Sequence, residues 1–368
     1  MAKNSVDYRA AGVDYTKIDP LKIDAQRAAR ETAGNLPKGI TELADSRGES
    51  AYVIDIGGQL IAAITECLGT KVLIAEPMRA ITGKTYFDAL AQDTLAMAIN
   101  DIITVGATPV FVHAYWAAGS SDWFADQERA RDLIQGWKKA CDTAKVAWGG
   151  GETPSLVGVV NPNAIDLAAS CTGVINPRER LTLQSRIAPG DAIVILAASG
   201  IHANGVSLAR KIAADSKEGY SAKLRDGRLF GDALLDPTPL YSPVTEAVFA
   251  AGVIPHYCAN ITGHGWRKIM RHPADFTYRF DMIPPVPPVL AYLQDQAGMS
   301  DAEAYGTFNM GAGFALIVAA ADAAKTVAAA QAVGVTAWQA GTVEAGAKSV
   351  VIEPLDVTFS SEDLHLRA

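Results

Sequence analysis

The sequence lacks the features that mark several classes of protein. Its four cysteines, at positions 67, 141, 171 and 258, include no Cys-x-x-Cys pair, so neither a zinc ribbon nor a disulfide framework is indicated. No apolar stretch approaches the ~18 residues of a membrane span, and the first residues contain no apolar core of a secretory signal. We therefore expect a cytoplasmic protein with reduced thiols and no membrane association.

Several catalytic signatures are also missing. The six histidines form no His-x-x-x-His or His-Glu-x-x-His pair, which argues against a zinc enzyme. No Gly-x-Ser-x-Gly elbow is present, and no Gly-x-Gly-x-x-Gly fingerprint follows a strand pattern, so a serine hydrolase and a Rossmann dehydrogenase are disfavoured. The net charge of -8 without a basic run predicts no nucleic-acid partner.

The composition is that of a globular α/β protein with two domains. The chain has 368 residues, 49% of them hydrophobic and 20% charged, which is long for one core. Short apolar runs alternate with helical patterns in both halves, so we expect an α+β fold. The pattern restarts at Asn176-Pro177, and we place the domain boundary there, between residues 1–176 and 177–368.

Hydrophobic periodicity and Gly/Pro punctuation predict the following elements. Strands are expected over 52–56, 60–64, 72–75, 109–116, 146–148, 164–174, 191–198, 315–319 and 341–352. Helices are expected over 24–32, 87–105, 121–144, 205–214, 243–252 and 322–334, and an extended connection over 284–288.

The helix over 87–105 carries the first candidate site. It is mostly apolar, yet it contains Asp93, Asn100 and Asp101. Asp93 and Asn100 are two turns apart and share one face. Buried carboxylates need a cation, hydrogen-bond donors or solvent. A magnesium–phosphate site and a solvated face or cap for a neighbouring loop are about equally compatible with this spacing.

Two glycine turns in the first half could approach a ligand. In the run 148–154, Gly150 and Gly151 precede Glu152 and Thr153, and a carboxylate on such a turn could hold a second metal ion. The run 66–71 combines Glu66 with Gly69, Thr70 and Lys71, and the lysine could pair with phosphate. An exposed turn and a solvated lysine are the simpler interpretations.

The second half contains two strand–turn–helix junctions of small residues. One runs from Gly200 through His202 and Asn204 to Gly205, and the other contains Thr262 and Gly263 and is followed by cationic residues. Helix N-termini suit anions because their free N–H groups point outward. Taken singly, each is more simply an ordinary junction.

Read in order, these segments resemble aminoimidazole ribonucleotide (AIR) synthetase, the phosphoribosylformylglycinamidine cyclo-ligase family, over nearly the whole chain. The similar segments are Tyr8 to Asp14, Asp93 to Asp101 continuing to Pro109, Gly150 to Thr153, Ser199 to Gly205, and Thr307 to Gly311. The family's Asp-Gly-Val-Gly-Thr-Lys is Glu66-Cys67-Leu68-Gly69-Thr70-Lys71 here, and its Thr-Gly-Gly-Gly is Thr262-Gly263-His264-Gly265.

The resemblance implies a fold and an activity. It implies N-terminal sheets that pair across a two-fold axis into a barrel in a homodimer, and a second α/β domain that covers the cleft. It implies ATP with Mg²⁺ as cofactor, formylglycinamidine ribonucleotide as substrate, and ATP-dependent ring closure in purine biosynthesis.

The resemblance also assigns expected roles to residues. Metal ligands would be Glu66, Asp93, Asp101 and Glu152, and the catalytic set would be Asp93, Asn100, His202 and Asn204. Cofactor-binding residues would be Gly69, Thr70, Lys71, Gly150, Gly151, Thr153, Gly200, Gly205, Thr262, Gly263 and Asn309. On this assignment Asp93→Asn abolishes ATP turnover and leaves the fold intact.

Two alternatives stay open at this point. Relatives within the superfamily phosphorylate thiamine monophosphate, make selenophosphate or act in hydrogenase maturation, and this chain could share one of those activities. The substitutions at Glu66 and Cys67 would also be compatible with a catalytically silent nucleotide-binding scaffold.

Overall fold

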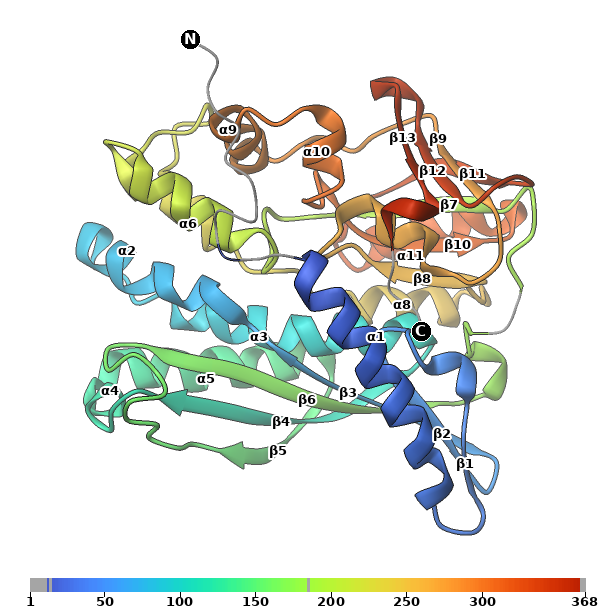
Figure 1. Ribbon diagram of the computed structural model, residues 1–368, viewed down its shortest axis with the longest axis horizontal. Helices are drawn as coiled ribbons and strands as arrows, with labels where there is room; N and C mark the ends of the chain where they lie inside the picture. Colours follow the sequence, from blue (N-terminus) through green and yellow to red (C-terminus); the bar gives the residue numbers. More distant parts are fainter. Residues whose placement is uncertain (1–11, 13–14, 184–185, 365–368) are drawn as a thin grey trace.

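The computed structural model describes residue 12 and residues 15–183 and 186–364. These residues form two β-sheets with helices packed between and around them (Figure 1). The opening segment that resembles the family, residues 8–14, lies almost wholly outside the described residues. No helix in the described part combines the length and the apolar character needed to cross a membrane.

The first sheet has six strands in the order β1-β2-β3-β6-β4-β5. Their bounds are β1 Ile40–Glu42, β2 Tyr52–Ile56, β3 Gln59–Cys67, β4 Thr108–Ala118, β5 Ala147–Glu152 and β6 Ile165–Ile175. All neighbours are antiparallel except β4 and β5, so the carboxyl ends of β3, β4 and β5 lie at the same edge. In β6 buried residues alternate with half-buried ones, as expected where one face packs on a core.

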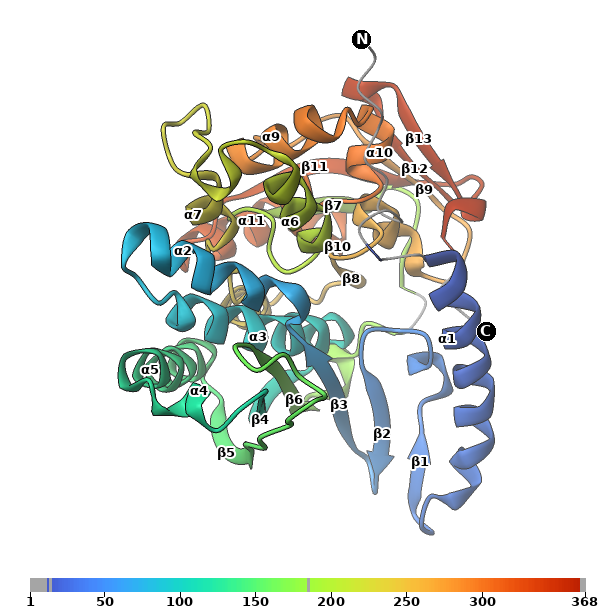
Figure 2. The same cartoon turned by 60° about the vertical axis from the view of Figure 1, so that its left-hand side comes forward.

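Helices cover the buried face of this sheet. The helices of this half are α1 Tyr15–Glu31, α2 Ala75–Thr82, α3 Phe87–Ile102, α4 Asp122–Ala125 and α5 Gln127–Ala144. α3 packs on β3, β6 and α5 and lies between the first sheet and the second domain (Figure 1). α1 lies along the other side, beside β1 and β2 (Figure 2). α1 lies over part of the opposite face of this sheet, where Gln26, Ala29 and Thr32 line one cavity together with residues of β3 and β6.

The second sheet has seven strands in the order β13-β12-β9-β11-β7-β10-β8. The strands are β7 Ala192–Ala197, β8 Tyr257–Asn260, β9 Thr277–Phe280, β10 Ala312–Val318, β11 Ala337–Glu344, β12 Ser349–Ile352 and β13 Val357–Ser360. Its helices are α6 Val206–Asp215, α7 Phe230–Leu234, α8 Ser242–Ala250, α9 Pro288–Ala297, α10 Asp301–Tyr305 and α11 Ala323–Ala332. Every residue of β10 is buried, which explains its continuous apolar run.

Most predicted elements are present, and one predicted strand is wrong. The helix over 87–105 is confirmed, its last turn being a 3-10 segment, Ile103–Val105. The helix over 121–144 divides at Asp126, which caps α5. The strand expected over 72–75 is instead the end of a 3-10 segment, Gly69–Ile74, that leads into α2. The helix expected over 24–32 begins earlier, since α1 starts at Tyr15.

The glycine run over 149–151 also differs from its prediction. It was expected as a turn after a strand, but it lies within β5, the edge strand of the first sheet. A Cβ atom on Gly151 would lie 2.1 Å from the carbonyl oxygen of Ala114, so glycine is required where β5 passes close to β4. The first sheet ends at Ile175 and the second begins at Ala192; the boundary at Asn176-Pro177 stays a prediction.

Candidate functional site

A cavity of about 310 Å³ lies where α1, β3, α3 and two loops of the second domain meet. Six of its residues were singled out by the resemblance or belong to its loops: Glu66, Asp101, Asn204, Thr262, Gly263 and His264. The other lining residues are Lys22, Gln26, Glu49, Ser50, Ile64, Met97, Lys268 and Arg271. The cavity therefore joins residues about 240 positions apart in the chain, as expected of a site between two domains.

Three carboxylates line this cavity from the first domain: Glu49, whose Oε2 lies 3.7 Å from Arg271 Nε, and Glu66 and Asp101. Glu66 stands near the end of β3, and Asp101 stands in the last turn of α3, where its Oδ1 accepts a hydrogen bond of 2.7 Å from Asn260 Nδ2. Burial, and next the charge of Asp101, raise the pKa of Glu66 to about 7. The pair therefore has a strong electrostatic preference for a cation between or beside its two members.

Cationic side chains surround the same space. Lys268 is half-buried and donates to Thr262 Oγ1, and desolvation of its ammonium group lowers the pKa of that group. Arg271 donates to Ser50 Oγ and lies 3.7 Å from Glu49 Oε2. Lys22 enters from α1. Carboxylates and cations in one cavity suit a ligand that carries both phosphate groups and a metal ion.

Asn204 supplies a further polar group. It lies in the loop between β7 and α6, and its Nδ2 is buried without a hydrogen-bond partner in the structure. A buried amide donor that lacks an acceptor is costly, on the order of 1–3 kcal/mol. A ligand oxygen in the cavity would satisfy it. This observation supports the expected contact of Asn204 with substrate.

Asp93 does not line this cavity, which the sequence did not anticipate. Its Oδ2 is 2.6 Å from Lys71 Nζ, and both side chains are 0% exposed. Its Oδ1 accepts from Thr238 N at 2.8 Å and Thr238 Oγ1 at 2.5 Å. Lys71 also donates to the carbonyl oxygen of Asp236 at 2.9 Å. Of the interpretations that the sequence left open, the cap for a neighbouring loop describes Asp93 in this structure, and its expected role as a metal ligand and catalytic residue stays a prediction.

Asn100 has a similar place on α3. Its Nδ2 donates to the carbonyl oxygen of Pro239 at 2.8 Å, and its Oδ1 accepts from Tyr241 N at 2.9 Å. Asp93 and Asn100 do share one face, as predicted, and that face binds the segment 236–241 of the second domain. Both residues thus hold the two domains together, and neither reaches the cavity.

His202 and Asn309 are buried beside the cavity. His202 is 2% exposed, and its Nε2 accepts from Ser199 N at 3.4 Å. Burial, and next the charge of Lys71, lower the pKa of His202 to about 3, so its ring is neutral near pH 7. Asn309 donates to the carbonyl oxygen of Gly200 at 2.9 Å and accepts from Gly311 N. These two side chains fix the loop that carries Asn204.

The glycines of these loops allow close packing. Gly205 precedes α6 with φ of 89°, and a Cβ atom there would lie 2.3 Å from Phe308 Cε1. Thr70 Oγ1 lies 3.1 Å from Ser207 Oγ, so the segment that begins at Gly69 also contacts α6. Gly205 is therefore required for the close packing of its loop on Phe308, whereas a Cβ atom on Gly200 would lie at an ordinary contact distance and one on Gly69 would meet open space. Thr262 and Gly263 line it directly.

Glu152 and Glu66 lie far apart in space within one chain. In the sheet register Glu66 pairs with Ala169, Ala169 with Ala114 and Ala114 with Gly151, which places β5 three strands from β3. At about 4.8 Å per strand this is roughly 14 Å, too far for one metal ion to bind Glu66 and Glu152. Glu152 is exposed and accepts from Thr153 N, and Gly150 adjoins open space. Thus Gly150, Gly151, Glu152 and Thr153 lie apart from the cavity.

Sequence reasoning missed four residues of the cavity: Lys22, Gln26, Glu49 and Ser50. Lys22 and Gln26 are polar residues four positions apart in α1, and this spacing is typical of an ordinary solvated helix face. Only the fold of α1 against β2 and β3 brings Lys22 and Gln26 to the site. Arg271 and Lys268 gave a usable signal, because they follow the glycine loop that begins at Thr262.

Glu66→Gln is expected to stabilise the folded protein above neutral pH. The folded-state pKa of Glu66 is about 7, above its ordinary 4.5, so its contribution to stability is present below pH 4.5 and is lost as pH rises through 7. The glutamine variant removes this loss, which amounts to about 1–3 kcal/mol. Urea unfolding at pH 5 and pH 8 measures it. An equal stability difference between variant and wild type at both pH values would contradict this assignment.

Sequence models of two known domains together match most of the chain. Residues 48–175 match the sequence model of the AIR synthase related protein N-terminal domain, and residues 188–353 match that of its C-terminal domain. A phosphoribosylformylglycinamidine cyclo-ligase of Methanococcus maripaludis is 32% identical over 343 residues, covering 92% of each chain. One of Burkholderia lata is 32% identical over 349 residues, covering 92% of this chain and 93% of the relative.

A solved structure adds evidence on the fold. Hydrogenase maturation protein HypE in complex with ATP has a TM-score of 0.56 and 17% identity, covering 81% of this chain and 83% of that chain. At this identity the likeness concerns the fold alone. The fold described above is thus similar to that of this solved structure.

Proposed function

The chain belongs to the AIR synthase related protein family, and on that premise we propose that it catalyses the ATP-dependent ring closure of formylglycinamidine ribonucleotide to aminoimidazole ribonucleotide. Two relatives at 32% identity over nine-tenths of the chain carry the cyclo-ligase name. The superfamily alternatives have weaker support, because the solved neighbours of other function share 17% identity or less. The expected cytoplasmic location is part of the same proposal.

The observation that carries the proposal is the composition of the cavity between the domains. Glu66 and Asp101 provide negative charge, and Lys22, Lys268 and Arg271 provide positive charge. Phosphoryl transfer needs charge neutralisation and positioning more than a protein nucleophile. No cysteine is among the described residues lining the cavity, and the Oγ atom of its one lining serine, Ser50, accepts a hydrogen bond of 2.8 Å from Arg271 Nη1.

The cavity also fits Mg²⁺ held together with phosphate. No group of three or more His, Cys, Asp or Glu side chains in the described part of the chain could hold a metal ion alone. Mg²⁺ in nucleotide sites commonly uses one or two carboxylates together with phosphate oxygens and water. Glu66 and Asp101 would supply these carboxylates. The bound ion would neutralise negative charge on the phosphates during transfer.

The reaction then follows from substrate chemistry and the residues present. The γ-phosphoryl group of ATP passes to the formyl amide oxygen, and ADP leaves. A nitrogen of the substrate attacks the activated carbon, the C–O bond breaks, inorganic phosphate leaves, and loss of a proton completes the imidazole ring. Lys22, Lys268 and Arg271 would neutralise phosphate oxygens, and Asn204 Nδ2 would donate to a substrate oxygen.

The remaining expected residues act by positioning in this proposal. Lys71, Asp93 and Asn100 fix α3 against the second domain. His202 and Asn309 fix the loop of Asn204. None of these five side chains would contact ATP in a single chain.

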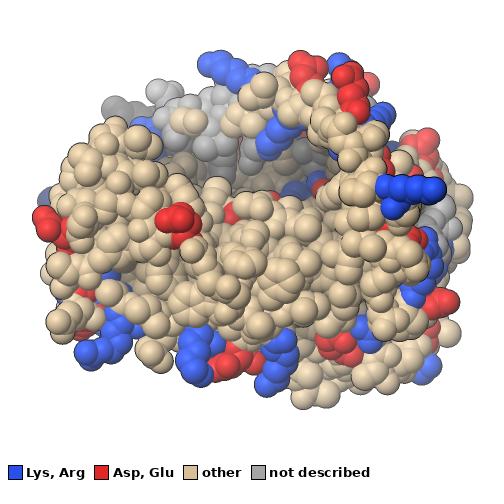
Figure 3. Space-filling model, turned by 90° about the horizontal axis from the view of Figure 1, so that it is seen from below, with Lys and Arg blue, Asp and Glu red and all other residues tan. Residues whose placement is uncertain are grey.

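We also propose that the protein is a homodimer joined through the first sheet. The face of β4 and β6 turned away from the helices includes half-buried Phe111 and Tyr115, and β5 is exposed at the sheet edge. Seen from below, this side of the molecule has a largely uncharged centre (Figure 3). A dimer would bury this face and pair its strands. Light scattering is expected to give a mass near twice 38.7 kDa; an active monomer at assay concentration would contradict the proposal.

An ATP hydrolysis assay with and without formylglycinamidine ribonucleotide tests the function. We expect ADP release to depend on this substrate and to match aminoimidazole ribonucleotide in amount. Hydrolysis that depends instead on thiamine monophosphate or selenide would favour the superfamily alternatives. ATP binding without turnover on any of these substrates would favour the silent scaffold.

A further inference from the structure

His264 departs from the family pattern, and no role derived above uses it. It stands third in the segment Thr262 to Gly265, where the family has glycine. Its backbone φ is 68°, a left-handed conformation that glycine adopts freely and that costs another residue on the order of 1 kcal/mol. Gly265 also has a positive φ, and a Cβ atom there would lie 2.2 Å from the carbonyl oxygen of Tyr305, so the segment keeps the shape of a glycine loop. The backbone gains nothing from histidine, and the reason for this residue therefore lies in its side chain.

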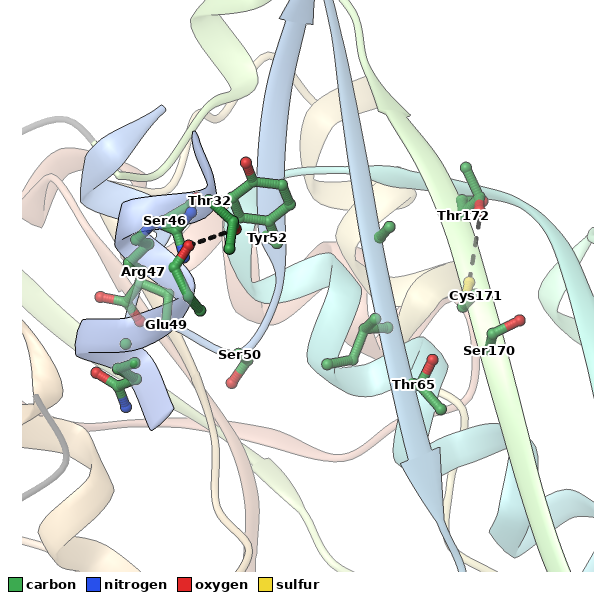
Figure 4. Close-up of a pocket in the computed structure, with 15 residues that line it drawn as sticks. Thr32, Ser46, Arg47, Glu49, Ser50, Tyr52, Thr65, Ser170, Cys171 and Thr172 are labelled. Carbon is green, nitrogen blue, oxygen red and sulfur yellow. Dashed lines mark hydrogen bonds between the residues drawn. The ribbon is translucent and has the colours of Figure 1, made fainter. Parts of the chain in front are cut away.

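The side chain of His264 lines the cavity between the domains. It is 7% exposed, and Asn204 lines the same cavity from another loop of the second domain. A second cavity, of about 620 Å³, lies beneath α1, and the described residues that line it all belong to the first domain (Figure 4). Recognition by the loop of His264 therefore concerns a ligand in the smaller cavity.

The ring of His264 is neutral at physiological pH. Burial, and next the charges of Arg267 and Lys268, lower the pKa of His264 to about 3. The ring therefore does not serve as a cation for phosphate. A neutral imidazole instead offers one N–H donor and one acceptor nitrogen.

Asp19 of α1 favours one tautomer of this ring. Its Oδ2 lies 3.8 Å from His264 Nε2, and a neighbouring carboxylate favours a proton on the nitrogen that it faces. Nδ1 is then the acceptor of the ring. The carbonyl oxygen of His264 accepts a hydrogen bond of 3.2 Å from Arg267 Nε, which holds the loop backbone. His264 is thus a held side chain that contributes an acceptor.

Several second-domain groups of this cavity can only donate hydrogen bonds. Lys268 and Arg271 carry no acceptor, and Thr262 Oγ1 already accepts from Lys268. Asn204 Nδ2 is a buried donor. The acceptor of His264 and the donor of Asn204 together match a ligand group that carries an N–H and an oxygen. The formyl and amidine groups of the proposed substrate carry both.

We propose that His264 is a specificity-determining residue, whose imidazole accepts a hydrogen bond from an amidine N–H of the substrate while Asn204 Nδ2 donates to a substrate oxygen. This inference rests on the proposed function and deepens it, because it names a residue that distinguishes an amidine from an amide. The amide analogue of the substrate has a carbonyl oxygen in place of the amidine nitrogen. That oxygen has no proton to donate and faces the acceptor of the ring, so the amide binds more weakly.

The test compares the two ligands in wild type and in His264→Gly. Titration calorimetry, with Mg²⁺ and a non-hydrolysable ATP analogue present, measures Kd for formylglycinamidine ribonucleotide and for its amide analogue without turnover. Glycine suits the φ of 68° and removes the ring. Wild type should bind the amidine at least about fivefold more tightly than the amide, the worth of one neutral hydrogen bond. In His264→Gly the amidine should bind about fivefold more weakly and the amide as in wild type, so that the preference falls about fivefold.

Two further variants make the test specific. Asparagine also tolerates a positive φ, and its amide can turn to present either an oxygen or an NH₂ group, so His264→Asn should bind both ligands with little preference. His256→Asn is the matched control, because His256 is hydrogen-bonded to Asp191 and lies outside the cavity. It should keep the preference of wild type. Thermal unfolding of each variant confirms that the protein measured is folded.

The possible results separate this inference from the proposed function. Equal Kd values for amidine and amide in wild type, or an unchanged preference in folded His264→Gly, would overturn the role of His264 and leave the proposed function intact. Equal weakening of both ligands in His264→Gly would show a role in loop structure alone and would also overturn it. If wild type binds the amidine but forms no aminoimidazole ribonucleotide, the proposed reaction fails, and a lost preference in His264→Gly would still support the inference.

Discussion

Lys71→Met is expected to destabilise the protein by about 3–5 kcal/mol, because it leaves the Asp93 carboxylate buried without its cation. Lys71 Nζ and Asp93 Oδ2 are 2.6 Å apart and both side chains are 0% exposed. Methionine matches the length of lysine and removes its charge. Urea unfolding at pH 7 gives the free energy of unfolding directly.

Two further variants make this prediction specific. Lys71→Met with Asp93→Asn should recover more than half of the lost stability, since asparagine keeps an acceptor for Thr238 and carries no charge. Lys211→Met breaks the exposed pair of Lys211 with Asp215 and should cost less than about 0.5 kcal/mol. A loss in Lys71→Met as small as in Lys211→Met would show that Asp93 is not held by Lys71.

The same geometry changes what Asp93→Asn should do. The sequence alone predicted lost ATP turnover in an intact fold, whereas the buried pair predicts lost stability first. Activity measured below the unfolding transition should be reduced only as far as the two domains shift relative to each other. Asp93→Asn therefore tests where the Asp93 side chain lies, and a variant of Glu66 is the stronger test of a role in the reaction.

Glu66→Gln is expected to reduce kcat by a factor of about 100 or more, because one lost electrostatic contact to a transferring phosphoryl group costs on that order. Glutamine keeps the shape and removes the charge. Glu66→Asp should retain part of the activity, since the charge survives and the reach is shorter by ~1.5 Å. The expected order of kcat is Glu above Asp above Gln, measured at saturating ATP and a series of Mg²⁺ concentrations.

A control and a contrary outcome accompany this series. Glu246→Gln alters a carboxylate near the domain interface, where it accepts from Thr108 and Arg180, and should leave kcat near that of wild type. Equal kcat for Glu, Asp and Gln at position 66 would show that Glu66 takes no part in the reaction. If Glu66→Gln shows the expected gain in stability above neutral pH, its loss of activity does not come from unfolding.

Much of the fold was predictable where local pattern and tertiary packing agree. The helix over 87–105 was predictable from its length, its apolar content and the Gly106 that ends it, and β2 matches its prediction in both bounds. The run 72–75 failed because four apolar residues suit a strand or a buried helix equally. There the buried residues Val72, Ile74 and Met78 pack as part of a 3-10 segment and α2.

The site was predictable in part for a related reason. Glu66, Asp101 and Asn204 line the cavity, and each stands beside a feature that local sequence predicts. Glu66 precedes the turn at Gly69, Asp101 lies in the last turn of α3, and Asn204 lies directly before Gly205. Lys22 and Glu49 could not be found this way, since only the packing of α1 and β2 brings them there. The positions of Asp93 and Asn100 depended on the segment 236–241, which no local pattern links to α3.

The central claim is that ring closure proceeds by phosphoryl transfer to the formyl oxygen of the substrate. Substrate labelled with ¹⁸O at this oxygen tests it most directly, with the released phosphate analysed by mass spectrometry. We expect one labelled oxygen in each inorganic phosphate, formed in equal amount with ADP and aminoimidazole ribonucleotide. Phosphate that carries no label while the imidazole product forms would contradict the account.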